Sequence, residues 1–304
     1  MRTPPPISRV ISFPVTGGIA ILAVAVSLGW WAHRVPVEAL EMTSAAWHGQ
    51  PWRLWTCALP HAGVLHLVFD VYWVWVFGTL VEESFGSLAT LGIYLVLAGG
   101  SAAAEWALAS GGVGLSGVGY GLFGLLWVLS RRSERFAEAI DRQTINLFIG
   151  WFFLCIVLTA FDVLPVANVA HGSGCLLGIL LGFMIADRPA RRIAWGLAIA
   201  LFLAAAGVFA SVLRPMVNLS KFGGYDEFQQ GYDALTSGQN ESAATHLRRA
   251  VAYRHADATY WYDLGIAEER LGHAPAALSA YQRASAMQPE SAEFRSAVRS
   301  MQSQ

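Results

Sequence analysis

A serine and a histidine in apolar stretches of this chain have the residue types that nucleophilic catalysis needs. Ser116 lies in the block Gly114-Leu115-Ser116-Gly117, and His171 lies in a second glycine-rich stretch. A serine hydroxyl is a weak nucleophile unless a base takes its proton, and histidine commonly serves as that base. Ionisable groups inside membrane segments are costly and usually functional. We therefore predict a Ser-His dyad, because no aspartate is obviously placed to orient His171.

The sequence around Ser116 also predicts groups that could stabilise an oxyanion. Ser116 falls just before or at the start of a predicted helix, where backbone N–H groups are unpaired and point outward. Small residues allow two membrane helices to approach closely. Those in the two stretches include Gly124, Gly174, Gly178 and Gly182. If these faces pack, His171 reaches Ser116, and Tyr120, one helical turn past Ser116, can stack on the imidazole.

Three more polar residues, His61, His66 and Asp70, lie close together in the sequence. His66 and Asp70 are four residues apart and share one helical face. We expect His61 on the preceding loop or first turn, pointing elsewhere. Histidine and aspartate also bind metals, but the chain lacks a His-Glu-x-x-His motif and this spacing separates the two histidines. We therefore predict no metal centre.

Long apolar segments predict that membrane-spanning helices position these residues. Segments of this kind are long enough to cross a bilayer. We expect seven spans, at about Val15–Trp31, Val64–Leu80, Leu88–Leu108, Gly117–Ser130, Ile145–Leu164, Asn168–Ala186 and Ala194–Leu213. The fourth is short and rich in glycine, so it is expected inside the bundle, beginning below the membrane surface. Glu82 and Glu83, at the end of the second span, are expected to be solvated.

Positive charge in the loops predicts the orientation of the spans. One side of the predicted spans carries Arg2, Arg9, Arg131, Arg132, Arg135, Arg142, Arg188, Arg191 and Arg192. The other side carries Arg34, Arg53, Arg214 and Lys221. Because basic loops stay in the cytoplasm, we expect the N-terminus inside and everything after the seventh span outside.

The composition excludes several classes of function. Only 13% of the 304 residues are charged and 55% are hydrophobic, against about 25% charged residues in ordinary soluble domains. The net charge of −1 leaves no basic excess for a nucleic-acid groove. The only lysine is Lys221, and no glycine-rich loop contains it, which argues against phosphoryl transfer. We predict no cofactor, and the three cysteines imply no disulfide framework.

The segment from about Tyr225 has a different composition and contains a repeat with a period of 34 residues. Matched positions include Gly231 with Gly265 and Gly238 with Gly272. This pattern resembles the tetratricopeptide repeat, in which paired helices stack and bind peptides or partner proteins. A plain pair of helical hairpins is the alternative. We expect a capping helix after Pro289.

Four motifs in the first part of the chain together resemble the rhomboid intramembrane serine proteases. They are Gly-x-Ser-Gly-x-x-Tyr-x-x-x-Gly from Gly114, Ala-His-x-x-Gly-x-x-x-Gly from Ala170, the first-loop signature around Trp52 and Arg53, and His61-x4-His66-x3-Asp70. The resemblance covers roughly residues 1–190. It implies Ser116 as nucleophile, His171 as general base, and an oxyanion site from His61, the backbone near Ser116 and the residue at 70.

One position departs from the family pattern, which has asparagine where this chain has Asp70. An amide donates to an oxyanion, whereas an ionised carboxylate repels it, and losing one oxyanion donor costs on the order of 100- to 1,000-fold in turnover. Asp70 could be protonated, could pair with a protonated His66 or His61, or the enzyme could tolerate a weaker oxyanion hole. These alternatives stay open, and we expect an activity that depends on pH.

Two functions therefore remain. The first is an intramembrane serine protease that cleaves single-span membrane proteins near the outer face. The second is a catalytically impaired protein that binds membrane helices and recruits partners through its repeats. Ser116 and His171 favour the first, and Asp70 favours the second. Trp52 and Arg53 could instead only anchor a loop at the membrane interface.

The predicted fold is all-α: a polytopic membrane bundle with a rhomboid-like six-helix core and a seventh span, followed by a small tetratricopeptide-like domain. The expected domains are a protease core at 1–190, the seventh span and linker at 191–224, and two repeats with a capping helix at 225–304. We expect an integral protein of a bacterial inner membrane, with the bilayer and transmembrane substrates as partners and no nucleic acid.

Overall fold

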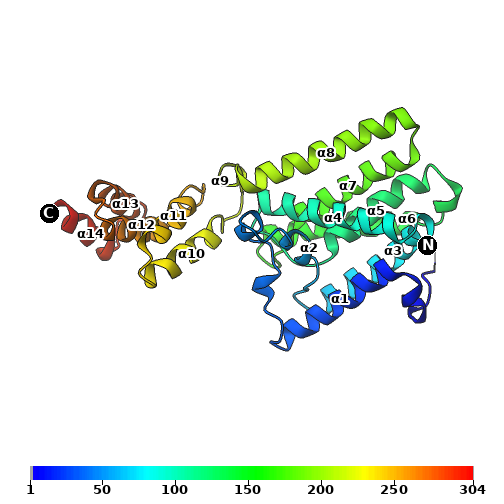
Figure 1. The fold of residues 1–304 in the computed structure, drawn as a ribbon, viewed down its shortest axis with the longest axis horizontal. Helices are drawn as coiled ribbons and strands as arrows, with labels where there is room; N and C mark the ends of the chain where they lie inside the picture. The colour runs from blue at the N-terminus through cyan, green and yellow to red at the C-terminus, as the bar shows by residue number, and fades with distance from the viewer. Residues whose placement is uncertain (1–2, 304) are drawn as a thin grey trace. The chain divides into compact units, whose positions relative to one another are not determined.

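The computed structural model describes residues 3–303 and contains no strand in that range, so Arg2 lies outside the described residues. Two compact units divide the chain, Met1–Ser211 and Val212–Gln304. The first unit (Figure 1) contains α1 (Pro14–Trp31), α2 (Arg53–Thr56), α3 (Val64–Phe85), α4 (Ser87–Leu108), α5 (Ser116–Ser130), α6 (Arg142–Ala160), α7 (Asn168–Ala186) and α8 (Pro189–Ser211). Its 3-10 helices are η1 (Ile7–Ser12), η2 (Val37–Ala39), η3 (Ser44–Trp47) and η4 (Glu134–Phe136).

Six helices among the described residues are long and apolar enough to cross a membrane, namely α1, α3, α4, α6, α7 and α8. The shorter α5 has 15 residues. The predicted all-α membrane bundle is therefore confirmed. The helix ends differ from the predicted spans because polar terminal turns extend the helices: α3 continues to Phe85, and α8 begins at Pro189.

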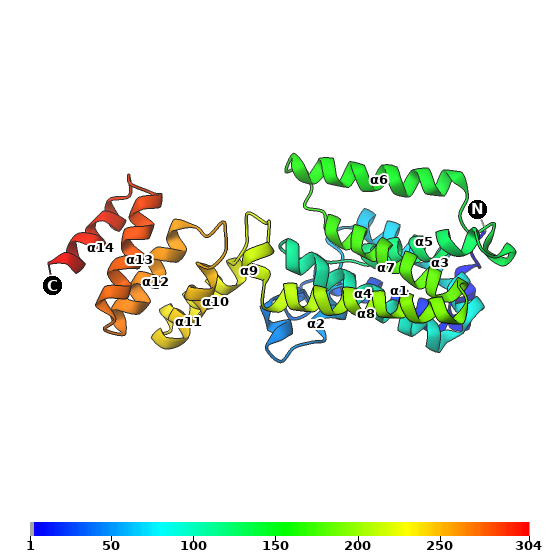
Figure 2. The same cartoon turned by 90° about the horizontal axis from the view of Figure 1, so that it is seen from above.

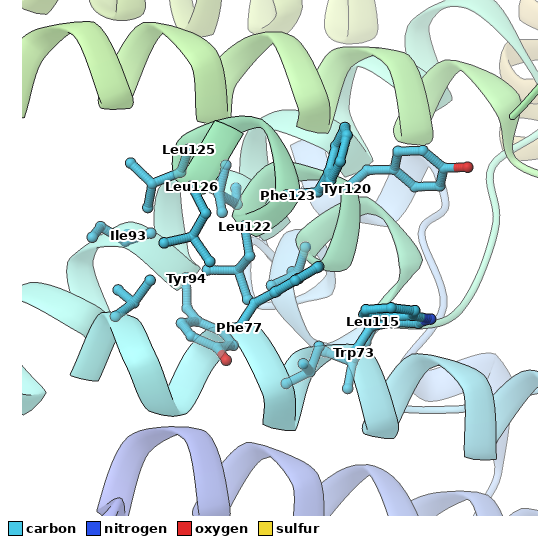
Figure 3. Close-up of a cluster of buried hydrophobic side chains, with 14 of the residues drawn as sticks. Trp73, Phe77, Ile93, Tyr94, Leu115, Tyr120, Leu122, Phe123, Leu125 and Leu126 are labelled. Carbon is cyan, nitrogen blue, oxygen red and sulfur yellow. The ribbon is translucent and has the colours of Figure 1, made fainter. Parts of the chain in front are cut away.

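The short α5 lies at the centre of the bundle. It packs most extensively against α7 and also contacts α3 and α4. Figure 3 shows Leu122 of α5 beside Phe77 of α3, with Leu125 and Leu126 farther along α5 in the same cluster, and all four side chains are almost completely buried. Close packing of this kind, rather than escape from water, holds helices together in lipid. The surrounding helices therefore compensate for the short length of α5.

In contrast, α6 has few buried positions and runs along one side of the first unit (Figure 2). Its buried residues are Thr144, Phe148 and Cys155. Phe148 stacks on Phe123 of α5, with ring centroids 4.5 Å apart and planes 4° apart. The outward apolar residues of α6 suit a lipid-facing surface. A single aromatic layer therefore makes much of the contact between α6 and the centre of the bundle.

The expectation that Glu82 is solvated is wrong, because its carboxylate caps another helix. Glu82 is 5% exposed. Its Oε1 accepts the N–H of Val15 at 3.0 Å, and its Oε2 accepts that of Thr16 at 2.9 Å. The first N–H groups of a helix lack internal partners and attract negative charge. A buried acid here therefore satisfies the start of α1.

The second unit contains only helices among its described residues. They are α9 (Arg214–Val217), α10 (Tyr225–Thr236), α11 (Asn240–Ala250), α12 (Ala258–Arg270), α13 (Ala274–Met287) and α14 (Ala292–Gln302). Gly238 follows α10 and Gly272 follows α12, with φ angles of 75° and 76°, a conformation that favours glycine after a helix. A Cβ at Gly231 would meet Leu247, and one at Gly265 would meet Tyr281. The residues that match at the 34-residue period therefore occupy equivalent structural positions.

Candidate active site

Ser116 is the first residue of α5, and the turn before it depends on glycine. Gly114 has a φ of +113°, which side-chain-bearing residues rarely adopt. Its N–H donates to the carbonyl of Cys57 at 3.0 Å. Leu115, the N-cap, is almost fully buried. This turn places Ser116 and Gly117 in the first turn of α5, where backbone N–H groups have no acceptor within the helix.

His171 of α7 lies within hydrogen-bonding distance of Ser116. The distance from His171 Nε2 to Ser116 Oγ is 2.8 Å. His171 is 4% exposed, and its Nδ1 has no hydrogen-bond partner among the described residues. The Tyr120 ring stacks on the imidazole, with centroids 4.6 Å apart and planes 21° apart. An aromatic ring, rather than a carboxylate, therefore orients this histidine.

Glycines let α5 and α7 approach backbone to backbone. A Cβ at Gly174 would collide with the carbonyl oxygen of Gly117, and one at Gly178 would collide with that of Gly121. Gly124 lies in the same way against the Cys175 carbonyl. This close contact brings the beginning of α5 next to the first turns of α7. The distance between Ser116 and His171 therefore depends on small residues that begin beside the dyad and continue along both helices.

Glu105 of α4 is a site residue that the sequence analysis missed. It is 4% exposed, and its Oε2 accepts the N–H of Ala170, one residue before His171, at 2.9 Å. The carboxylate thus caps the N-terminus of α7. A cavity of about 30 Å³ lies among residues that include Ser101, Glu105 and Ser116. An acid within an apolar span was the sequence signal that could have identified it.

His61, His66 and Asp70 form a compact cluster. Asp70 Oδ2 lies 3.2 Å from Nε2 of His61 and 3.3 Å from Nε2 of His66. The prediction that His61 points elsewhere is wrong: its ring meets that of His66 with centroids 4.9 Å apart. His61 precedes α3, so helical periodicity does not determine where it points. The argument from spacing that separated the two histidines therefore fails.

His61 and His66 differ in exposure and in hydrogen bonding. His61 is completely buried, whereas His66 is 35% exposed. His61 Nδ1 lies 3.0 Å from the Leu59 carbonyl, which can only accept, so we assign the proton to Nδ1. His61 Nε2 then accepts the N–H of Leu115 at 3.2 Å. His61 therefore fixes the turn before Ser116, and His66 is the histidine that a substrate can reach.

Arg53 organises the long loop between α1 and α3, and Trp52 does not share its environment. Arg53 is 8% exposed, and its Nη1 donates to the carbonyls of Glu38 at 2.6 Å and Glu41 at 2.8 Å. Trp52 is 48% exposed. Both features fit the interpretation in which these two residues anchor a loop. Neither side chain contacts Ser116 or His171 in the hydrogen bonds and ring contacts described.

An apolar cleft of about 370 Å³ reaches the candidate dyad from the side of α6. Its lining includes Tyr120, Phe148, Phe152, Phe153 and His171. The cleft lies where α6 meets α5 and α7. An extended apolar segment could therefore reach His171 from this direction.

Comparisons with known proteins identify the region that contains this arrangement. Residues 48–188 match the family model of the rhomboid domain. The chain is 28% identical over 190 residues to the rhomboid protease GlpG of Yersinia pseudotuberculosis serotype I (strain IP32953), covering 59% of this chain and 66% of that protein. It is 34% identical over 137 residues to the rhomboid protease GlpG of Pectobacterium atrosepticum, covering 44% of this chain and 48% of that protein.

The chain thus spans less than two thirds of the length of each of these relatives. The matched residues run from before α2 to the end of α7, so they include both Ser116 and His171. These comparisons show that residues 48–188 are similar to the rhomboid domain, and the apolar helices of the first unit fit an integral membrane protein. The second unit lies outside the matched segment.

Proposed function

We propose that this protein is an intramembrane serine endopeptidase in which Ser116 is the nucleophile and His171 is the general base. The observation that carries the proposal is the distance of 2.8 Å between Ser116 Oγ and His171 Nε2 inside a bundle of apolar helices. A serine next to a neutral imidazole can lose its proton as it attacks. The buried position of His171 favours the neutral ring that a base requires.

Peptide hydrolysis would proceed in two stages at this dyad. Ser116 Oγ attacks the carbonyl carbon of the scissile bond, and its proton passes to His171 Nε2. His171 then protonates the leaving amine, the C–N bond breaks, and an ester remains on Ser116. Water attacks the ester, His171 accepts a proton from that water, and Ser116 regains its hydrogen as the new carboxylate leaves.

The oxyanion of each tetrahedral intermediate needs donors close to Ser116. The N–H groups of Ser116 and Gly117 at the start of α5 supply two. Because His61 is buried and holds Leu115, His66 is the better side-chain donor. Asp70 Oδ2 lies 3.3 Å from His66 Nε2, which supports pairing of the carboxylate with a protonated His66. In this arrangement Asp70 favours the charged donor instead of repelling the oxyanion directly.

Water and substrate would reach the dyad from different places. The cavity beside Ser101 and Glu105 has room for about two water molecules, each of which needs ~10–15 Å³. The aromatic cleft beside α6 suits an unwound segment of a single-span membrane protein. The loop charges favour cleavage near the outer face, with the N-terminus of the chain inside.

The second unit would serve this activity as a tetratricopeptide-like domain outside the membrane. Its equivalent glycines after α10 and α12, and the close packing at Gly231 and Gly265, support paired repeats. Such repeats present surfaces that bind peptides or partner proteins. Substrate delivery or recruitment of an adaptor is the role that fits this location.

The experiment uses the purified protein in detergent, a single-span substrate with a helix-destabilising segment, and the Ser116→Ala variant. Cleavage by the wild type that is lost in Ser116→Ala supports the protease. If the wild type is inactive and Asp70→Asn restores cleavage, the protein is instead a membrane-helix binder derived from a disabled protease. The feature that favours this second function is the aspartate at position 70.

A further inference from the structure

The cluster of His61, His66 and Asp70 has the dimensions of a metal site. Zinc binds histidine nitrogen at about 2.0–2.1 Å and carboxylate oxygen at about 2.0–2.2 Å, so the edge between two tetrahedral ligands is about 3.3 Å. The distances of 3.2 and 3.3 Å from Asp70 Oδ2 to the two Nε2 atoms match this edge. The three ligand atoms all lie within 4.8 Å of one another. Only the edge between the histidines must shorten.

The hydrogen bonds around the cluster also suit a metal. Asp70 is 4% exposed, yet its Oδ2 has no hydrogen-bond partner of acceptable geometry within residues 3–303. Ligating histidines almost always donate their other ring N–H to a carbonyl or carboxylate. His61 Nδ1 lies 3.0 Å from the Leu59 carbonyl, so its Nε2 carries the lone pair that a metal needs, and here that lone pair accepts the Leu115 N–H. A buried carboxylate oxygen, close to two histidine nitrogens but without a well-formed hydrogen bond among residues 3–303, and an imidazole in the required tautomer therefore lie in one cluster.

The site can also be reached and can adjust. His66 is 35% exposed, so an ion can approach from its side, and its ring is free to shorten the remaining edge. Gly114 adjoins the cluster, because a Cβ there would lie 2.7 Å from His66 Nε2 and 3.3 Å from Asp70 Oδ2. The absence of that Cβ leaves room beside the two ligands. A three-ligand site with one open position results.

We infer that His61, His66 and Asp70 bind a divalent transition-metal ion of the zinc class, and that this ion reversibly inhibits the protein. Binding would draw His61 Nε2 away from the Leu115 N–H, which shapes the turn before Ser116. It would also occupy His66, the accessible oxyanion donor. The binding stands by itself, whereas the inhibition rests on the proposed protease activity. The metal is an inhibitor here and takes no part in peptide hydrolysis.

Binding is tested with Co²⁺ as a spectroscopic substitute for zinc, on the purified full-length Ser116→Ala protein in detergent. Tetrahedral Co²⁺ absorbs visible light strongly, whereas Co²⁺ held by a two-ligand pair such as His246 with Glu227 stays six-coordinate and absorbs weakly. We expect one intense band per chain that excess Zn²⁺ abolishes. Asp70→Asn and His66→Gln should each weaken Co²⁺ binding at least about 10-fold. The exposed control His255→Gln should leave the band unchanged.

Whether the metal site exists is decided by the Ser116→Ala protein alone, whether or not the cluster variants fold. If that protein shows no intense Co²⁺ band, the proposed site is contradicted. A band that survives either cluster variant overturns the three-ligand assignment. Inhibition is measured separately, as Zn²⁺ suppression of substrate cleavage by the wild type and recovery with a chelator. The rate of each protein is first normalised to its own rate without metal. The Zn²⁺ concentration that halves this rate should then be at least about 10-fold higher for Asp70→Asn than for the wild type. Binding without inhibition contradicts only the inhibitory role, and a wild type that never cleaves contradicts the protease but not the metal site.

Discussion

His171 has an unusual environment for the catalytic base that we propose, because no side chain among residues 3–303 hydrogen-bonds its Nδ1. In a triad a carboxylate holds the imidazole in its tautomer and orientation. Here Tyr120 stacks on the ring, and the Tyr120 hydroxyl donates to the Phe148 carbonyl at 3.0 Å. The orientation of the base therefore depends on the position of one aromatic ring.

Tyr120→Leu is expected to lower kcat about 10- to 100-fold, because the imidazole loses its stacking partner and small misplacements are costly. Tyr120→Phe keeps the ring and loses only the hydroxyl, so it should retain most of the activity. Steady-state cleavage of one substrate by both variants measures the difference. Equal losses in the two variants would mean that the hydroxyl, not the stacking, positions His171.

Asp70→Asn tests how the carboxylate acts. If Asp70 pairs with a protonated His66, activity should depend on pH in the wild type, and the amide should change that dependence. The expected result is a shifted or flattened pH profile of kcat, accompanied by a changed rate. The measurement is cleavage across about pH 5 to 9, the range in which histidine commonly titrates. A profile and rate identical to the wild type would contradict the pairing.

The sequence predicted the residues of the site better than their contacts. Ser116, His171 and Tyr120 fall on helices whose periodicity and glycines indicate which faces meet. His61 lies in a loop, where periodicity carries no information about direction, and its contact with His66 was predicted wrongly. Glu105 was missed: its place in an apolar span marks it as unusual, but no local pattern shows that it caps α7, which lies far away in the sequence.

At the scale of the helices, the contact between α5 and α7 has the least tolerance for added volume. Gly178→Ala is expected to destabilise the fold by about 1–3 kcal/mol or more, because its Cβ would collide with the Gly121 backbone. Gly150→Ala on α6 is the matched control, since nothing lies within 4 Å of its added Cβ. Reversible unfolding in mixed micelles measures the free energy of unfolding of the two variants and of the wild type. A neutral Gly178→Ala would contradict the backbone-to-backbone contact.

The approximate positions of six of the seven predicted spans could be predicted from hydropathy, because lipid forces long apolar helices to satisfy their own backbone; the remaining predicted span corresponds to the shorter α5. The central position of α5 could be predicted from its short length and its glycines. The role of Glu82 could not, since the start of α1 that it caps lies far away in the sequence. Spans are thus local properties, whereas caps between helices depend on the tertiary fold.

At the scale of the whole molecule, the two units are expected to respond differently to pH. Burial raises the pKa of Asp263 in α12 to about 6, and the nearby charge of Glu293 adds to the shift. The unfolded value is about 3.9, so the folded unit binds the proton more tightly. The stabilisation is therefore fully present below about pH 4 and is lost as the pH rises through about 6.

Asp263→Asn should remove this dependence and stabilise the second unit at pH 7.5 by on the order of 2 kcal/mol. Hydrogen exchange of the α12 amides in the full chain, at pH 5 and pH 7.5 after correction for intrinsic rates, measures the effect. The amides of α5 serve as an internal reference in the other unit. The same protection of α12 at both pH values in the wild type would contradict the role of Asp263.

The most direct test of the central claim asks whether Ser116 is an activated nucleophile, and it needs no knowledge of the substrate. A fluorophosphonate is incubated with the purified protein; the serine oxygen displaces fluoride from phosphorus, and mass spectrometry locates the phosphonyl group that is then attached to the serine. Labelling of Ser116 in the wild type, lost in Ser116→Ala and reduced at least about 1,000-fold in rate in His171→Ala, is the predicted result. Labelling of Ser116 that proceeds equally well without His171, or no labelling of the folded wild type, would contradict the dyad.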